Sequence, residues 1–130
     1  MKKNVMHVIC KRIDDIGIGL LRHRENNKQV SIQVTVKCHN DNTLECYANG
    51  KDDVRMLRNK TVSLIQKYGD DYLYISGLAE KILPGLGGKI LSIRIYKACW
   101  FVKQSKGTLS WLKEKYVYDF TSRQKLQIAS

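Results

Sequence analysis

The sequence has no long apolar run, a single proline and few acidic residues. No stretch approaches the roughly 18 consecutive apolar residues that a membrane-spanning helix needs. Residues 1–12 are basic, but their apolar stretch is too short for a signal peptide, so we expect an intracellular protein, cytoplasmic or organellar and not secreted. Because no repeat, low-complexity tract or linker is visible, we predict one domain over residues 1–130.

Cysteine is also sparse. The chain holds Cys10, Cys38, Cys46 and Cys99, spread widely and without close pairs. In a reducing compartment such residues are free, buried thiols. Cys38, His39 and Cys46 would lie on one hairpin, but a zinc site takes four ligands in close pairs, and seven residues separate the two cysteines. We therefore predict buried thiols and no metal site.

The acids and histidines show no pattern typical of a catalytic site. The acids stand as adjacent doublets at 14–15, 52–53 and 70–71, and neighbouring side chains point apart on a strand and splay on a helix. The three histidines have no companion nucleophile at a recognisable spacing. We predict no catalytic residue and no cofactor. A small metal-dependent nuclease, with acids drawn from distant positions, is kept as an alternative.

Basic residues outnumber acidic ones, 23 to 12, and give a net charge of +11. The excess is concentrated near the end of the chain. Residues 81–130 hold ten basic residues against Glu114 and Asp119, a net charge of +8, which leaves +3 for residues 1–80. Such a field attracts polyanions: nucleic acid first, then an anionic membrane or an acidic protein.

The spacing of apolar residues predicts the first elements. Residues 5–21 have apolar side chains at helical intervals and predict a helix, with a short strand over the first half as the alternative. Over 30–48, alternation of apolar and polar residues predicts a β-hairpin, with turn residues at 39–42 between its strands and a closing turn at Asn49 and Gly50. Residues 52–68 predict a second helix.

Further along the chain, we predict a strand at 72–76, a short helical segment at 77–83, a strand at 89–103, a helix at 109–116 and a flexible tail at 121–130. The aromatic content of 108–120 also fits a returning strand. Together these elements predict an α+β domain with a mostly antiparallel sheet and two to three helices.

The only proline and three glycines gather in residues 82–90, ILPGLGGKI. A Walker phosphate loop needs glycine at position 83 and Ser or Thr at position 90, and these are Leu83 and Ile90, so that site is excluded. The GLGGK segment resembles the Gly-x-x-Gly loop of KH domains, which clamps a nucleic-acid backbone and implies a helix over 89–98. Because alternation there favours a strand, we predict instead a turn in which Pro84 ends a helix.

Aromatic and basic residues are interleaved in the last third of the chain. Cations contact phosphates, and aromatic faces stack on unpaired bases. The candidate nucleic-acid-binding residues are Lys89, Arg94, Lys97, Lys103, Lys106, Lys113 and Lys115. We expect the last four of these lysines to be exposed.

These patterns predict a non-enzymatic nucleic-acid-binding protein, a structural component of a ribonucleoprotein particle with further protein partners. RNA is favoured over DNA because the sequence shows no basic recognition helix or helix-turn-helix. The first alternative is a peripheral membrane-associated or self-assembling matrix-type protein whose basic face meets anionic lipid. The nuclease is the second.

Overall fold

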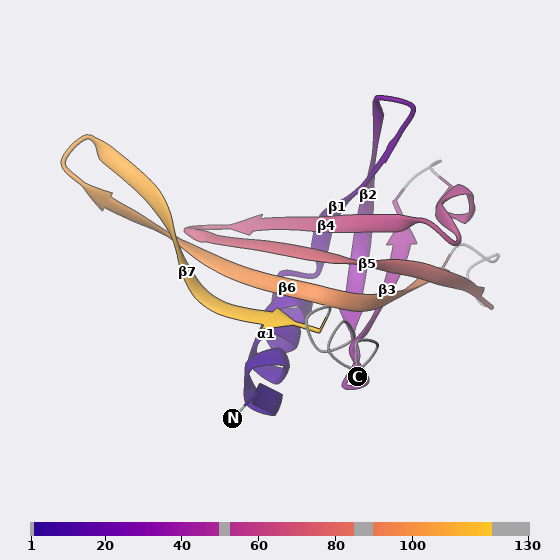
Figure 1. The fold of residues 1–130 in the computed structure, drawn as a ribbon, viewed down its shortest axis with the longest axis horizontal. Coiled ribbons are helices and arrows are strands. Elements are labelled where there is room, and N and C mark those ends of the chain that lie inside the picture. Colours follow the sequence, from indigo (N-terminus) through magenta and orange to yellow (C-terminus); the bar gives the residue numbers. More distant parts are fainter. Residues whose placement is uncertain (1, 50–52, 85–89, 121–130) are drawn as a thin grey trace, which may run out of the picture.

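A computed structural model of the chain describes residues 2–49, 53–84 and 90–120 (Figure 1). The elements are α1 (Lys2–Ile16), β1 (Ile18–Glu25), β2 (Lys28–Cys38), β3 (Thr43–Ala48), a 3-10 turn (Arg55–Leu57), β4 (Thr61–Tyr68), β5 (Asp71–Leu83), β6 (Ile90–Lys106) and β7 (Leu109–Asp119). The described residues thus form seven antiparallel strands and one α-helix, and the predicted α+β class with two to three helices is wrong. This one helix is neither long nor apolar enough to cross a membrane.

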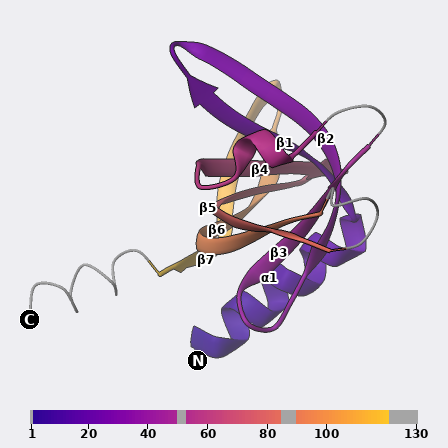
Figure 2. The same ribbon diagram turned by 90° about the vertical axis from the view of Figure 1, so that its right-hand side faces the viewer.

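Six of the strands form a sheet that closes on itself. The strand order is β3-β2-β1-β4-β5-β6-β7, and β3 also pairs with β6, residues 43–47 against 90–94. We call strands β1 to β6 the closed sheet. Closure gives each of these strands at least two hydrogen-bonded neighbours and so protects its edges. In the described chain β7 pairs with β6 alone and continues beyond the closed sheet as part of a long hairpin (Figures 1 and 2).

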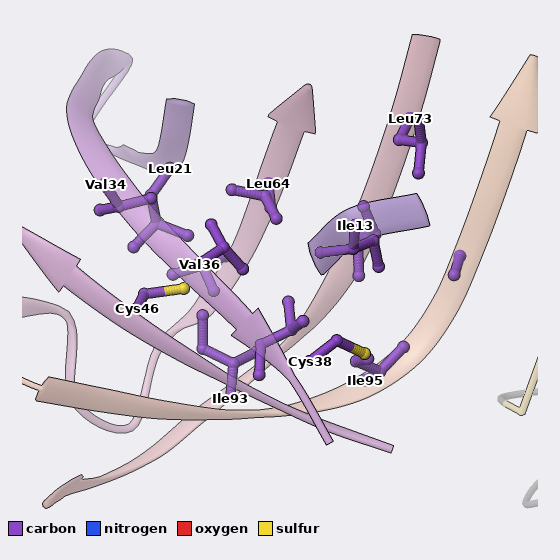
Figure 3. Close-up of a cluster of buried hydrophobic side chains, with 14 of the residues drawn as sticks. Ile13, Leu21, Val34, Val36, Cys38, Cys46, Leu64, Leu73, Ile93 and Ile95 are labelled. Carbon is purple, nitrogen blue, oxygen red and sulfur yellow. The ribbon is translucent and has the colours of Figure 1, made fainter. Parts of the chain in front are cut away.

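The core lies inside the closed sheet, where strand alternation places one side chain in two. Its buried members include Leu21, Ile32, Val34, Val36, Leu44, Cys46, Leu64, Leu73, Ile75, Leu91, Ile93 and Ile95 (Figure 3). Ile9 and Ile13 of α1 are fully buried in the same cluster, because the helix packs against β2, β4, β6 and β7. Burying large apolar side chains on this scale is the main stabilising term of the fold.

Polar contacts fix the end of α1 to the sheet. The buried Gln66 side chain donates through Nε2 to the carbonyl oxygens of Ile13, at 3.1 Å, and Ile18, at 3.0 Å. Between them the chain turns at Gly17, whose φ of 76° favours glycine. The Arg12 guanidinium lies 2.7 Å from the Asp71 carboxylate. These contacts explain why the helix ends at residue 16, earlier than the predicted 21.

The cysteine prediction is half wrong. A disulfide joins Cys10 of α1 to Cys38 of β2, with Cα atoms 5.4 Å apart, a separation typical of disulfides. Cys46 and Cys99 are free and buried, as predicted for all four. The sequence gives no sign of the bond, because 28 residues separate the two positions and only the packing of α1 on β2 brings them together.

The predicted hairpin over 30–48 is confirmed as β2 and β3, with Val34 against Ala48. The turn between the strands lies at residues 39–42, as predicted, whereas Asn49 follows β3 and does not connect the two strands. Gly50 lies outside the described residues. The alternation and the turn residues at 39–42 therefore identified the hairpin, while the closing turn assigned to Asn49 was wrong.

The predicted helix over 52–68 is wrong. Its second half is β4, whose inward residues Val62, Leu64 and Gln66 are buried and alternate with outward ones. Leu57, Leu64 and Ile65 also fit a helical interval, so the sequence suits both periods. Pairing with β1 and β5 decides for the strand, and such long-range pairing overrides local preference.

Two further helical predictions are wrong. Residues 77–83 continue β5 as strand, and Gly77 is suited to the close approach of β6, because a Cβ there would meet the Arg94 carbonyl oxygen. Residues 109–116 are strand in β7, and their ladder with residues 100–106 of β6 cannot be seen from one segment alone. The strands predicted at 72–76 and 89–103 are confirmed as parts of β5 and β6, from residue 90 on in the second case.

The glycine-rich stretch leaves part of its prediction open. Residues 85–89 and the tail at 121–130 lie outside the described residues. β6 is strand from Ile90, which excludes the helix that a KH arrangement requires over 89–98. β5 is strand up to Leu83, so Pro84 does not end a helix.

Candidate nucleic-acid interface

The hairpin of β6 and β7 extends past the rest of the closed sheet. β6 loses its last β5 partner at Val102, opposite Asp71, and pairs only with β7 up to the turn at residues 107–108. We call residues 103–115 the arm. In Figure 1 it is the orange loop that projects from the upper left of the molecule. Four of the seven candidate lysines and arginines lie on it: Lys103, Lys106, Lys113 and Lys115.

The register divides the arm into two faces, since directly opposed residues on antiparallel strands point to the same side. The pairs Lys106–Leu109, Gln104–Trp111 and Val102–Lys113 share the face that continues from the core, where Val102 packs against the core cluster. We call this the inner face. The pairs Lys103–Leu112, Ser105–Ser110 and Phe101–Glu114 form the outer face.

Lys115 occupies a β-bulge at the base of the arm. The ladder shifts there, so that Trp100 faces Tyr116 while Phe101 faces Glu114, and Lys115 is the extra residue. Its Nζ lies 4.4 Å from the centre of the Trp100 ring and 5.8 Å from that of Tyr116. Since Trp100 belongs to the core, Lys115 joins Lys106 and Lys113 on the inner side.

The arm is exposed on both faces. The four lysines are exposed, as predicted. Leu109 is 69% exposed, Trp111 48% and Leu112 49%, whereas Trp100 at the base is buried. The inner face thus carries an exposed tryptophan among three lysine side chains, and Glu114, the one acid of the arm, points to the outer face.

Arg94 and Lys97 are not part of this arrangement. Arg94 pairs with Glu80 at 2.5 Å and lines an open pocket of about 960 Å³ that also contains Asp41 and Glu45. Lys97 is exposed on β6, opposite Asp119 in the ladder. Lys89 lies outside the described residues.

One acid of each doublet has a structural contact. Asp14 accepts the backbone N–H of Cys38 at 2.6 Å, Asp71 pairs with Arg12, and Asp53 pairs with Arg55 at 2.8 Å. No group of three or more potential metal ligands occurs among the described residues. Residues 2–49, 53–84 and 90–120 therefore offer no cluster of the kind that the nuclease alternative needs.

The pKa shifts follow from burial and local contacts. Complete burial raises the pKa of the Cys46 thiol to about 12, and burial also raises the pKa of Cys99, so neither is an activated nucleophile. The Thr43 hydroxyl, which donates to Asp41 at 2.6 Å, lowers the pKa of that carboxyl. The Lys60 ammonium, 2.7 Å from Glu25, lowers the pKa of Glu25.

One basic group was missed from the sequence. Arg22, Arg24 and Lys60 line a second groove, formed by β1, β2, β4 and β5. The RHRENNK segment looks like a polar loop, but it is the end of β1 and a tight turn at Asn26 and Asn27, both at positive φ. Alternation of Arg22 and Arg24 about His23 was the available signal.

Comparison with known proteins gives no match to any family model and none to a curated protein.

Proposed function

We propose that the protein binds nucleic acid through the inner face of the arm, with RNA as the favoured partner. The observation that carries this proposal is the placement of Trp111 among Lys106, Lys113 and Lys115 on one exposed face of a two-stranded arm. An intracellular role as a structural, non-enzymatic part of a ribonucleoprotein particle belongs to the same proposal.

The spacing suits a nucleic-acid strand. Trp111 and Lys113 are two residues apart on β7, so their side chains leave the same face about 7 Å apart. Lysines at such intervals neutralise successive phosphates, while an exposed indole stacks on an unpaired base whatever its identity. This combination favours a single strand, whose bases are free to stack, over a duplex.

Duplex DNA is the main competitor within this proposal, because a two-stranded ribbon fits the major groove. The single described helix does not fit the role of a recognition helix, since Ile9 and Ile13 hold it against the core. A direct comparison of single-stranded RNA with duplex DNA at equal salt separates the two.

Self-assembly is the second candidate function, and the exposed Leu109 and Leu112 favour it. These side chains lie near the tip of the arm, on opposite faces, and a second copy that covered them would gain apolar burial. In that case Leu109 and Leu112 matter more than the lysines.

The test is a charge reversal of the arm. Changing Lys103, Lys106, Lys113 and Lys115 to Glu should weaken RNA binding across all sequences and flatten the log–log salt dependence by about 0.7 per lost phosphate contact. The melting temperature should change little, because exposed charges contribute little to folding. The matched control reverses four exposed lysines of the body: Lys11, Lys37, Lys67 and Lys81.

Anionic vesicles are measured alongside labelled RNA. If the arm variant no longer binds vesicles but still binds RNA, the membrane alternative is correct. If the RNA affinity of the control variant falls as much as that of the arm variant, RNA binding depends on the total charge of the protein and not on the arm. A triple variant that leaves Lys115 in place shows whether any loss comes from disturbing Trp100.

A further inference from the structure

The closed sheet carries a basic groove that is separate from the arm. It has a volume of about 610 Å³ and is lined by side chains from β1, β2, β4 and β5 and by Lys60. Arg22 and Arg24 are two residues apart on β1 and therefore point to the same side, the outer face of the sheet. The register places Arg22 directly beside Ser63 of β4.

The charges of Arg22 and Arg24 in this groove have no acidic partner among the described residues. Glu25 is the one acid among the lining residues, and its carboxylate is engaged with Lys60 at 2.7 Å. Within the described ranges, no acid forms an ion pair with Arg22 or Arg24. The Nε of Arg22 is buried and has no hydrogen-bond acceptor there, although buried donors are almost always paired. A guanidinium in this position is available to bind an anion.

Neutral donors and an apolar wall complete the groove. The Ser63 and Tyr74 hydroxyls lie 3.0 Å apart, so one proton serves the bond between them and the other is free to donate to a ligand. Ile65 pairs with Tyr74 across β4 and β5, and the Tyr74 ring is partly exposed. The groove thus combines a guanidinium fork, two hydroxyls and a flat, apolar surface.

We propose that this groove binds a phosphate group, held by Arg22, Arg24 and the Ser63 hydroxyl, with the body of the ligand on Ile65 and Tyr74. Arginine matches phosphate oxygens through two parallel N–H donors, which makes it the typical residue for such recognition. Glu25 opposes the ligand, because it repels the anion and occupies Lys60. The phosphate comes either from a small phosphorylated molecule or from a nucleic-acid strand.

The test uses adenosine monophosphate, with adenosine as the unphosphorylated control, followed by backbone NMR shifts and calorimetry. Saturable shifts should appear on β1, β4 and β5 with the monophosphate and not with adenosine. Arg22→Gln should weaken binding about tenfold or more, and Arg24→Gln, at an exposed position, should weaken it without affecting folding. Glu25→Gln should tighten binding. The control Lys37→Gln, on β2 outside the groove, removes one charge and should change little.

The same titration distinguishes the source of the phosphate. A trinucleotide without a terminal phosphate that competes for the groove identifies the strand as the source; its failure to compete identifies a small phosphorylated molecule. Equal binding of adenosine and the monophosphate, or unchanged affinity in both arginine variants, overturns the proposal. The groove variants keep all arm lysines. If the arm variant loses RNA binding while the groove variants keep it, that result tests the proposed function of the arm and not the groove.

Discussion

Strand β6 runs through both the closed sheet and the arm, and these two regions differ in how far their side chains are buried. Within the closed sheet its inward residues Leu91, Ile93 and Ile95 are at most 1% exposed, whereas Leu109 and Trp111, which face the far end of β6 in the arm, are 69% and 48% exposed. A two-stranded hairpin alone is marginally stable in water. The arm therefore depends on the closed sheet for its order, and the closed sheet does not depend on the arm for its core.

This difference separates stability from function along one strand. In the closed sheet a side chain is fixed by the space available, so most changes cost packing energy. On the arm a side chain makes few contacts within the chain, so changes there leave folding free energy nearly intact. In the proposed function, the lysines and the exposed tryptophan of the arm act through contacts outside the chain.

The largest effect is expected in the closed sheet. Val34 is fully buried, and Val34→Asp places an unpaired carboxylate in the core, which should cost about 4 kcal/mol or more and leave the chain unfolded. Its neighbour Gln33 is exposed, so Gln33→Asp is the matched control and should stay folded. Denaturant unfolding followed by circular dichroism measures both. A cooperatively folded Val34→Asp protein would contradict the assigned faces of β2.

The next effect concerns the disulfide between α1 and β2. Reduction of the Cys10–Cys38 disulfide opens a loop between residues 28 apart in sequence. The loop-closure model predicts that the unfolding free energy then falls by about 3–4 kcal/mol. Thiol counts in denaturant should give two free thiols before reduction and four after it, and the melting temperature should fall on reduction. A Cys10→Ser, Cys38→Ser double variant should match the reduced protein. Four thiols in the untreated protein would show that the bond is absent.

The sequence predicted the two regions unequally. Alternation identified β2 and β3 because one face of each meets the core, and interleaved charges identified the exposed lysines of the arm. Residues 109–115 of β7 could not be assigned from their own pattern, because they are exposed on both faces and bury no stripe. The Cys10–Cys38 bond, the closure of β3 on β6 and the Arg22 groove all depend on contacts between distant segments, which local spacing does not encode.

A smaller effect should appear in binding alone. Trp111→Ala removes a stacking surface from the inner face of the arm, so RNA affinity should fall by about 1–3 kcal/mol while the melting temperature hardly changes. Leu112 is exposed to the same degree on the outer face, and Leu112→Ala should leave RNA binding as in the wild type. Fluorescence anisotropy with a labelled single strand measures both. If instead Leu112→Ala lowers the oligomeric state in solution, the self-assembly function is correct.

The smallest effect should come from pH acting on one buried thiol of the closed sheet. The pKa of Cys46 rises from its ordinary 9.0 to about 12 on folding, because burial penalises the thiolate. Above pH 9 the unfolded state loses this proton and the folded state keeps it, so the stabilising term is complete below pH 9 and declines as pH rises toward 12. Between pH 8 and 10 the loss of unfolding free energy should be about 1 kcal/mol.

Cys46→Val keeps the volume and removes the ionisable proton. The unfolding free energy of the wild type minus that of the variant should therefore fall over this range. Trp111→Ala, in the arm, should follow the wild-type pH profile. Parallel curves for wild type and Cys46→Val would show that Cys46 titrates alike in both states and is not sealed in the core.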